Sequence, residues 1–218
     1  MKHKALSPPP RIDDTRFNGL LSHRDWARLP GAIRRRFGKR FSPGTSVLYR
    51  GIVTNMQISR IGMLLAHCAR LIGGPLPFDP SCVDRPAIVA VTEDTASDGQ
   101  FWIRQYNRRQ GFPQVVHSSK RFAGPTGLEE YIGNGVGMAL RVETDDEALY
   151  FVSDHYFIQV GQRRIPLPRW MSPGRLVVTH RHIDDTQFLF SLTLRNRWLG
   201  TLLHQDALFH ETQSMTEL

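Results

Sequence analysis

The sequence predicts an α+β protein in which two N-terminal helices pack against a strongly curved antiparallel β-sheet or β-barrel, lipocalin-like or calycin-like in general shape. Apolar residues recur at helical spacing only before residue 75, whereas segments rich in aromatic and β-branched residues follow it. Short turn sequences such as "SDG", "TDDE" and "DDTQ" separate these later segments. Strands joined so closely are antiparallel, because a parallel pair needs a connection of about a dozen residues or more.

The N-terminal region begins with a predicted tail and continues into the first helix. Residues 1–18 include three consecutive prolines and are expected to be disordered or extended, so residues 19–212 form the single predicted domain. Ser22 and Asp25 give a helix-capping signal, and Pro30 is expected to break or kink the helix. The apolar positions of this helix are Trp26, Leu29, Ile33 and Phe37, and Gly38 ends it.

The second helix is predicted over residues 60–74. Its apolar residues form one stripe, and a pair of glycines closes it. Such a stripe is typical of a helix packed on a core, and we prefer this interpretation to a helix lying on a membrane surface. The stripe consists of Ile61, Leu64, Leu65, Cys68, Leu71 and Ile72.

About nine segments are predicted to be strands, which suffices for a strongly curved sheet or a closed barrel. They are residues 46–55, 86–93, 100–109, 113–122, 129–144, 148–160, 175–183, 188–195 and 199–210.

The motif "GNGVG" lies within one of these strands, at residues 133–137. A dinucleotide-binding loop joins a strand to a helix, whereas here the strand continues, so nucleotide binding is not predicted. The three glycines alternate along the strand, so one of its faces carries no side chains there. This favours a sharp bend at a barrel corner, and close approach of a ligand is compatible with it.

The stretch "RLVVTHRHIDDTQFLFSL" places His180 and His182 two residues apart in a predicted hairpin. If Ile183 pairs with Phe188, both imidazoles face solvent. If the turn has one extra residue and His182 pairs with Phe188, both face the interior, because a one-residue slip exchanges the two faces of a strand. We expect the histidines to face solvent.

A metal site is not predicted at this histidine pair. Two imidazoles need at least a third ligand. Glu143, Asp154 and His155 are the nearest candidates by type, but no spacing rule brings them there. We therefore expect neither a metal nor any other cofactor.

Polar residues that interrupt apolar strands are the candidate ligand contacts. Trp102, Arg104 and Tyr106 share one face of a strand, and we expect Trp102 to line a cavity. The same alternation also occurs where one face of a sheet meets water. The candidate ligand-binding residues are Trp102, Arg104, Tyr106, His117, His155 and Trp170. The candidates for acid–base catalysis are His155, His180, His182, Asp154 and Tyr156.

Charge and cysteine content restrict the partners and the compartment. Residues 1–73 carry fourteen Lys and Arg against three Asp, concentrated in "RRRFGKR" at 34–40. A solvated helix end explains this cluster better than a nucleic-acid site, because interleaved aromatic residues are missing. Two isolated cysteines and the lack of a signal-like or membrane-spanning stretch predict a cytoplasmic protein without a membrane span.

The segment "RRIPLPRWMSPG" at 163–174, together with "FWIRQY" and "FLFSLTLRNRWLGTLLHQDALF", resembles the bacterial domain of unknown function numbered 4166. The similarity extends over roughly residues 20–210. It implies a stand-alone version of a domain that also occurs fused behind NAD(P)-binding dehydrogenase-like domains, and hence an NAD(P)-dependent enzyme as a partner. It implies no established catalytic residues.

The function we expect is the binding of a small hydrophobic ligand in the barrel cavity, as an accessory to a redox or biosynthetic enzyme. One alternative is a cofactor-free isomerase or cyclase that acts on a hydrophobic molecule in the same cavity. Another is an adaptor that uses the basic N-terminal helix. The sequence contains no GxSxG, HExxH or P-loop motif that would name a reaction.

Overall fold

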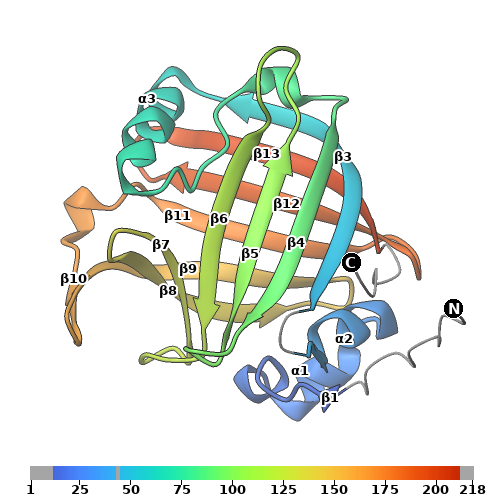
Figure 1. Cartoon of the computed structure of the whole chain (residues 1–218). Coiled ribbons are helices and arrows are strands. Elements are labelled where there is room, and N and C mark those ends of the chain that lie inside the picture. Colours follow the sequence, from blue (N-terminus) through green and yellow to red (C-terminus); the bar gives the residue numbers. More distant parts are fainter. Residues whose placement is uncertain (1–11, 43–44, 212–218) are drawn as a thin grey trace, which may run out of the picture.

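The protein is an antiparallel β-barrel with short helices at both ends, as a computed structural model of residues 12–42 and 45–211 shows (Figure 1). The strands of its main sheet are β3 (Ser46–Ile58), β4 (Pro86–Asp94), β5 (Gly99–Tyr106), β6 (Gln114–Arg121), β7 (Leu128–Gly133), β8 (Val136–Thr144), β9 (Ala148–Val160), β10 (Arg163–Pro166), β11 (Arg175–His182), β12 (Gln187–Asn196) and β13 (Gly200–Glu211). Their order is β10-β9-β11-β12-β13-β3-β4-β5-β6-β7-β8, and pairing of β8 with β9 closes ten of them into a barrel.

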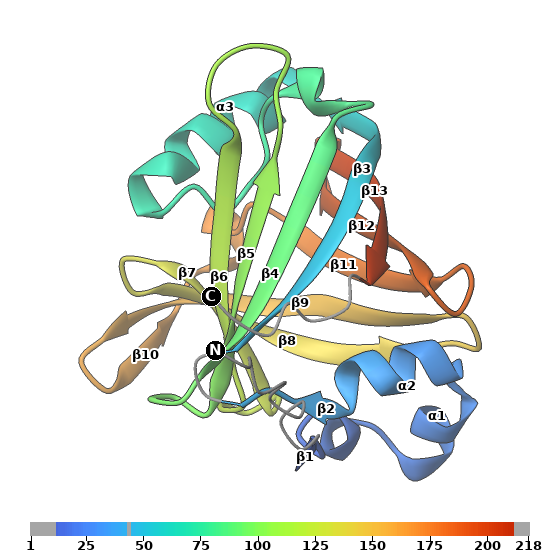
Figure 2. The same ribbon diagram turned by 45° about the vertical axis from the view of Figure 1, so that its right-hand side comes forward.

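Helices lie at the two ends of this barrel. α1 (His23–Arg28) and α2 (Gly31–Phe37) lie at one end, and α3 (Arg60–Ala69) lies at the other (Figure 2). No helix in the described ranges is long and apolar enough to cross a membrane. The shorter elements are the paired strands β1 (Ile12–Asp13) and β2 (Lys39–Arg40) and the 3-10 turns η1 (Asn18–Leu20), η2 (Arg70–Ile72), η3 (Pro80–Cys82) and η4 (Arg169–Met171).

The predicted α+β barrel architecture is confirmed. Every strand pairing in the described residues is antiparallel. The first predicted helix is divided between Leu29 and Pro30, because Pro30 caps α2 and cannot continue α1. Residues 1–11 of the predicted tail lie outside the described residues, whereas Phe17 at its end is buried in the core.

The segment 129–144 is not one bent strand but a hairpin of β7 and β8. Gly133, Asn134 and Gly135 all have positive φ, with values of 131°, 47° and 76°. An Asn-Gly pair in this conformation is typical of the tight turns whose twist matches that of two antiparallel strands. The expected bend is therefore a complete reversal of the chain, which adds a strand to the barrel.

The ladder around the barrel divides at β9. Residues 148–152 of β9 pair with β11, whereas residues 157–160 pair with β10. Between these two ladders the backbone of β11 bonds to a side chain instead, since the Leu176 N–H donates to the Ser153 hydroxyl at 2.9 Å. Strands β10 and β11 thus separate beside the barrel interior, and we call this place the β9 seam.

One half of the barrel interior, at the α2 end, is filled by aromatic side chains. Phe37 of α2 stacks on Trp102 with ring centroids 6.4 Å apart and meets His180 edge-on at 5.0 Å. A void of about 10 Å³ remains among these rings. A ligand-sized space can therefore exist only toward the α3 end.

The fully buried contacts of α3 with the barrel are made by small residues, while Leu65 and Ile72 of the predicted stripe are partly buried against the core. The buried residues of α3 are Gly62 and Ala66. A Cβ at Gly62 would lie 2.0 Å from the carbonyl oxygen of Leu202, so only glycine lets the helix approach β13 this closely. The expectation that the whole stripe faces the core is wrong, because four of its six members, Ile61, Leu64, Cys68 and Leu71, are exposed.

Candidate ligand pocket

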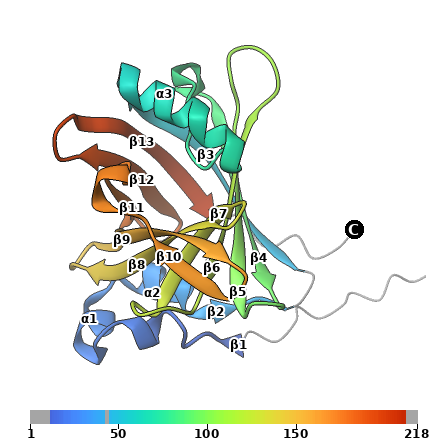
Figure 3. The same ribbon diagram turned by 90° about the vertical axis from the view of Figure 1, so that its left-hand side faces the viewer.

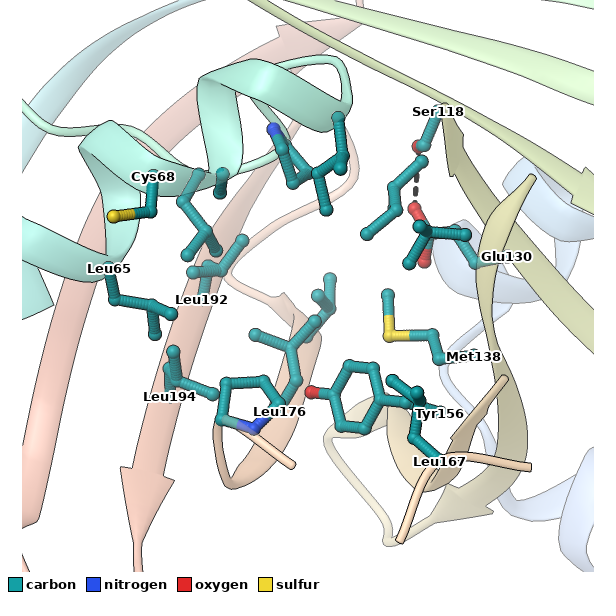
Figure 4. Close-up of a pocket in the computed structure, with 18 of the residues that line it drawn as sticks. Leu65, Cys68, Ser118, Glu130, Met138, Tyr156, Leu167, Leu176, Leu192 and Leu194 are labelled. Atoms are coloured by element: carbon teal, nitrogen blue, oxygen red, sulfur yellow. Dashed lines mark hydrogen bonds between the residues drawn. The ribbon is translucent and has the colours of Figure 1, made fainter. Parts of the chain in front are cut away.

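An apolar pocket of about 290 Å³ occupies the α3 end of the barrel interior. Figure 4 shows Leu192 and Leu194 on one side of it and Met138 and Tyr156 on the other. This volume lies at the lower end of the range for small-molecule sites, roughly 300–1,000 Å³. Apart from Cys68, the side chains with polar groups on its wall are Arg104, Ser118, Glu130 and Tyr156.

Two segments that line the pocket, α3 with η2 and the connection 167–174, can be followed as ribbons in Figure 3. On one side, α3 and η2 lie across the end of the barrel, where the Ser59 N–H donates to the Leu202 carbonyl at 2.9 Å and the Asn134 amide donates to the Leu71 carbonyl at 3.0 Å. On the other side lies the connection 167–174 between β10 and β11, which belongs to the β9 seam.

The inner end of the pocket is a buried polar cluster. Arg104 donates to the Ser118 hydroxyl at 2.5 Å and lies 3.4 Å from a carboxylate oxygen of Glu130. Ser118 in turn donates to Glu130 at 2.5 Å, as the dashed line in Figure 4 marks. The Lys120 ammonium lies 3.0 Å from the other Glu130 oxygen. Two cations thus share one carboxylate away from water.

Strand register brings this cluster together. Ser118 and Lys120 are two residues apart on β6 and point to the same, inner face. Lys120 is the direct cross-strand partner of Glu130 on β7, and opposite charges stabilise such pairs. Arg104 reaches the cluster from β5, the other neighbour of β6.

The pKa values follow from this arrangement. Burial alone would raise the pKa of Glu130, but the charges of Lys120 and Arg104 outweigh it and lower that pKa to about 2. Burial lowers the pKa of Lys120, and the attraction of Glu130 offsets this only in part. Glu130 is therefore ionised throughout the neutral range.

The predicted strip of Trp102, Arg104 and Tyr106 faces the barrel interior, with each side chain at least nine-tenths buried. Of the three, Arg104 lines the pocket. Trp102 lies beyond the polar cluster, among the aromatic rings, with the Lys120 ammonium 5.0 Å from its ring centroid. Tyr106 is buried in the core and does not line the pocket.

The other predicted contacts are placed differently. Tyr156 lines the pocket, and burial raises its pKa to about 12. His117 is exposed on the outer face of β6. Asp154 and His155 form a surface pair with 2.8 Å between Nδ1 and a carboxylate oxygen. Trp170 is 83% exposed on η4, next to the pocket-lining residue Met171.

The hairpin of β11 and β12 has the longer of the two turns considered for it. His182 pairs with Phe188, so His180 points inward and is 2% exposed. The expectation that it faces solvent is wrong, because the turn has one residue more than a register with Ile183 opposite Phe188 would need. Burial, followed by the cations of Arg36 and Lys120, holds the pKa of His180 well below its usual range. His182 is half-buried at the end of the strand.

His180 should make the protein less stable in mild acid. The unfolded chain binds a proton near the ordinary histidine pKa, about 6.5, whereas the folded protein does not, so stability falls as the pH drops below that value. Between about pH 7.5 and 5.5 this amounts to roughly 1.3 kcal/mol. Urea unfolding at both pH values should show a correspondingly smaller loss for His180→Leu. An equal loss in both proteins would contradict a neutral, buried imidazole.

Several pocket residues were not predicted from the sequence. Ser118 and Glu130 lie on strands whose neighbours could not be assigned, and the aliphatic wall looks like ordinary core. One signal was available, since Lys120 and Glu130 interrupt strands at positions that alternation places inside. Within the described ranges, no group of three or more His, Cys, Asp or Glu side chains could hold a metal ion.

Fold and pocket together define an antiparallel β-barrel protein with an apolar internal pocket that ends at a buried polar cluster. The chain belongs to the family described as domain of unknown function (DUF4166), whose family model matches residues 29–209. This confirms the resemblance found in the sequence. No curated protein and no solved structure matches the chain.

Proposed function

We propose that the protein binds a small hydrophobic molecule in this pocket and holds one polar or anionic end of it at Arg104 and Ser118. The observation that supports this most strongly is the position of Arg104. Arg104 lines the pocket at its polar end, beside Ser118 and Glu130, and its buried Nε has no hydrogen-bond partner among the described residues.

An unpaired buried donor is unfavourable by about 1–3 kcal/mol, so an acceptor on the ligand gains by meeting it. The cluster also carries two cations for one carboxylate. A carboxylate on the ligand would balance that excess, and hydrogen bonds between ions are stronger than those between neutral groups. The favoured ligand therefore has an aliphatic or ring-shaped body and a single carboxylate.

The same groups suit acid–base catalysis poorly. A catalytic group works best with a pKa near the operating pH. Glu130, with a pKa of about 2, is a weak base, and Tyr156, with a pKa of about 12, is a weak acid. We therefore rank a cofactor-free isomerase or cyclase second to a binding protein.

The adaptor hypothesis has less support from the basic segment 34–40. Arg36 is buried, with its guanidinium 3.7 Å from the centroid of the Phe188 ring, and Arg35 pairs with Asp185. This leaves a smaller free cationic surface than the sequence indicates. An accessory role beside an NAD(P)-dependent biosynthetic or redox enzyme, and a cytoplasmic location, stay predictions.

Displacement of a fluorescent apolar probe tests the binding proposal. Straight-chain carboxylic acids should displace the probe at lower concentration than alcohols of the same length. Arg104→Met should remove this preference and still fold, because it leaves Lys120 and Glu130 as a one-to-one pair. Leu194→Trp fills the pocket and should abolish binding of acids and alcohols alike.

The control is His117→Ala, on the outer face of β6, which should bind like the wild type. Equal affinity for acids and alcohols in the wild type would refute the anchoring role of Arg104. Undiminished binding to a folded Leu194→Trp variant would place the ligand outside this pocket.

A further inference from the structure

Large apolar side chains are exposed on segments that line the pocket or adjoin its lining residues. Leu71 of η2 is 82% exposed, Trp170 of η4 is 83% exposed, and Trp198 in the turn between β12 and β13 is 79% exposed. Scattered exposed apolar residues are ordinary, but a group of them marks an interaction site. We call this group the mouth face; it consists of Leu64, Leu71, Trp170, Met171, Trp198 and Leu199.

The segments that carry the mouth face are neighbours in space. The turn between β12 and β13 contacts the η4 connection, where the Asn196 amide donates to the Pro173 carbonyl at 3.4 Å. The start of β13 contacts α3 through the bond from Ser59 to Leu202. Figures 1 and 3 show α3, η4 and this end of β12 and β13 on one side of the barrel.

The same segments are strongly basic. Residues 60–72, 167–174 and 196–200 contain four arginines and neither aspartate nor glutamate. All four, Arg60, Arg70, Arg169 and Arg197, are exposed, and none of them has a carboxylate partner among the described residues.

Two of these arginines lie where a partner could use their charge. Arg60 is in the first turn of α3, where the helix dipole disfavours a cation, and that turn has no acidic residue. Arg197 lies over the exposed ring of Trp198, with 4.3 Å between its guanidinium carbon and the ring centroid. Both side chains are better suited to a partner than to the stability of the barrel.

We propose that the mouth face docks on the surface of an anionic lipid bilayer. Tryptophan favours the boundary between headgroups and acyl chains, and arginine is attracted to anionic headgroups. A second copy of the chain fits less well, because a two-fold interface brings the same patch against itself and so unites like charges. The pocket-lining segments α3, η2 and 167–174 then lie against the lipid, so an apolar ligand can pass between lipid and pocket with little exposure to water.

Co-sedimentation with vesicles tests this docking. The full chain should bind vesicles of phosphatidylcholine with about one-third phosphatidylglycerol, bind pure phosphatidylcholine much less, and dissociate as salt is raised. Arg169→Ser/Arg197→Ser should weaken binding by about 30-fold, since each arginine contributes roughly five-fold. Trp170→Ser/Trp198→Ser should weaken it by at least about ten-fold.

Matched variants at the other end of the barrel serve as controls. Arg24→Ser/Arg34→Ser removes the same charge from α1 and α2, and Ile103→Ser removes an apolar side chain that is 44% exposed on the outer wall. Both should bind like the wild type. Leu194→Trp should also keep vesicle binding while losing the pocket ligand. The docking proposal and the ligand-binding proposal are therefore tested independently.

Three outcomes would overturn the proposal. One is no binding to anionic vesicles, and another is binding that the control pair of arginines reduces as much as the mouth-face pair. The third is a wild type that sediments as a dimer without lipid and becomes monomeric in Trp170→Ser/Trp198→Ser. That result would assign the mouth face to self-association.

Discussion

Replacing Glu130 with leucine is expected to lower the free energy of unfolding by about 3–5 kcal/mol, the usual effect of leaving a buried charge without its partner. Here two cations lose the one carboxylate that they share, because Arg104 and Lys120 both contact Glu130. Urea or thermal unfolding measures this loss. A smaller effect is expected for Lys120→Met, since it leaves Arg104 and Glu130 as a one-to-one pair.

The decisive comparison is between the losses in free energy of unfolding of Glu130→Leu and Lys120→Met. Equal destabilisation by Glu130→Leu and Lys120→Met would show that packing, not charge balance, controls the cluster. The difference between wild type and Glu130→Leu should also depend on pH. Glu130 stabilises the fold above its ordinary pKa of 4.5, and this contribution is lost as the pH falls toward its folded pKa of about 2.

Gly62→Ala is expected to destabilise the protein by about 1–3 kcal/mol, as overpacking does. Helix propensity alone predicts the opposite, because alanine is favoured over glycine inside a helix by about 0.5–1 kcal/mol. The close contact with the Leu202 carbonyl decides the sign, since the added Cβ cannot fit without displacing α3 from β13. Thermal unfolding measures the stability, and the fluorescent-probe assay should show weaker ligand binding, because α3 borders the pocket.

The control for this prediction is Gly19→Ala, in η1 at the other end of the barrel. A Cβ there meets no atom within 4 Å, so the substitution should be neutral or slightly stabilising. If Gly62→Ala were as stable as Gly19→Ala and bound the probe normally, α3 would not depend on a small residue at its contact with β13.

The sequence predicts the barrel because each strand can be recognised from the residues of its own segment. Alternation and β-branched residues are visible within each segment, and short turns force antiparallel pairing whichever strands are neighbours. Closure of the barrel is different, since it depends on the pairing of β13 with β3, two strands that lie far apart in the sequence. The Asn-Gly pair at 134–135 is a signal for the hairpin of β7 and β8, whereas the spacing of the three glycines alone indicates a bend in a single strand.

The site was predicted only in part, because it depends on which inward-facing residues remain in contact with a cavity. Trp102 and Arg104 both point into the barrel. Aromatic rings around Phe37 enclose Trp102, whereas Arg104 lines the pocket. Whether His180 points inward or toward solvent depends on the length of the turn between β11 and β12, where one residue makes the difference. For α3, apolar spacing missed the two buried residues, Gly62 and Ala66, because they carry little hydrophobic surface.

The β9 seam sets how the pocket can change size. A barrel with an unbroken ladder can widen only if backbone hydrogen bonds break, so its lumen tolerates a narrow range of guests. Here Tyr156, Leu167 and Leu176 line the pocket where β10 and β11 diverge. Because the described residues show no ladder between β10 and β11, we expect this wall to yield more readily than the rest of the barrel. A series of homologous guests should then lose affinity gradually as the chain lengthens, without a sharp limit at one length.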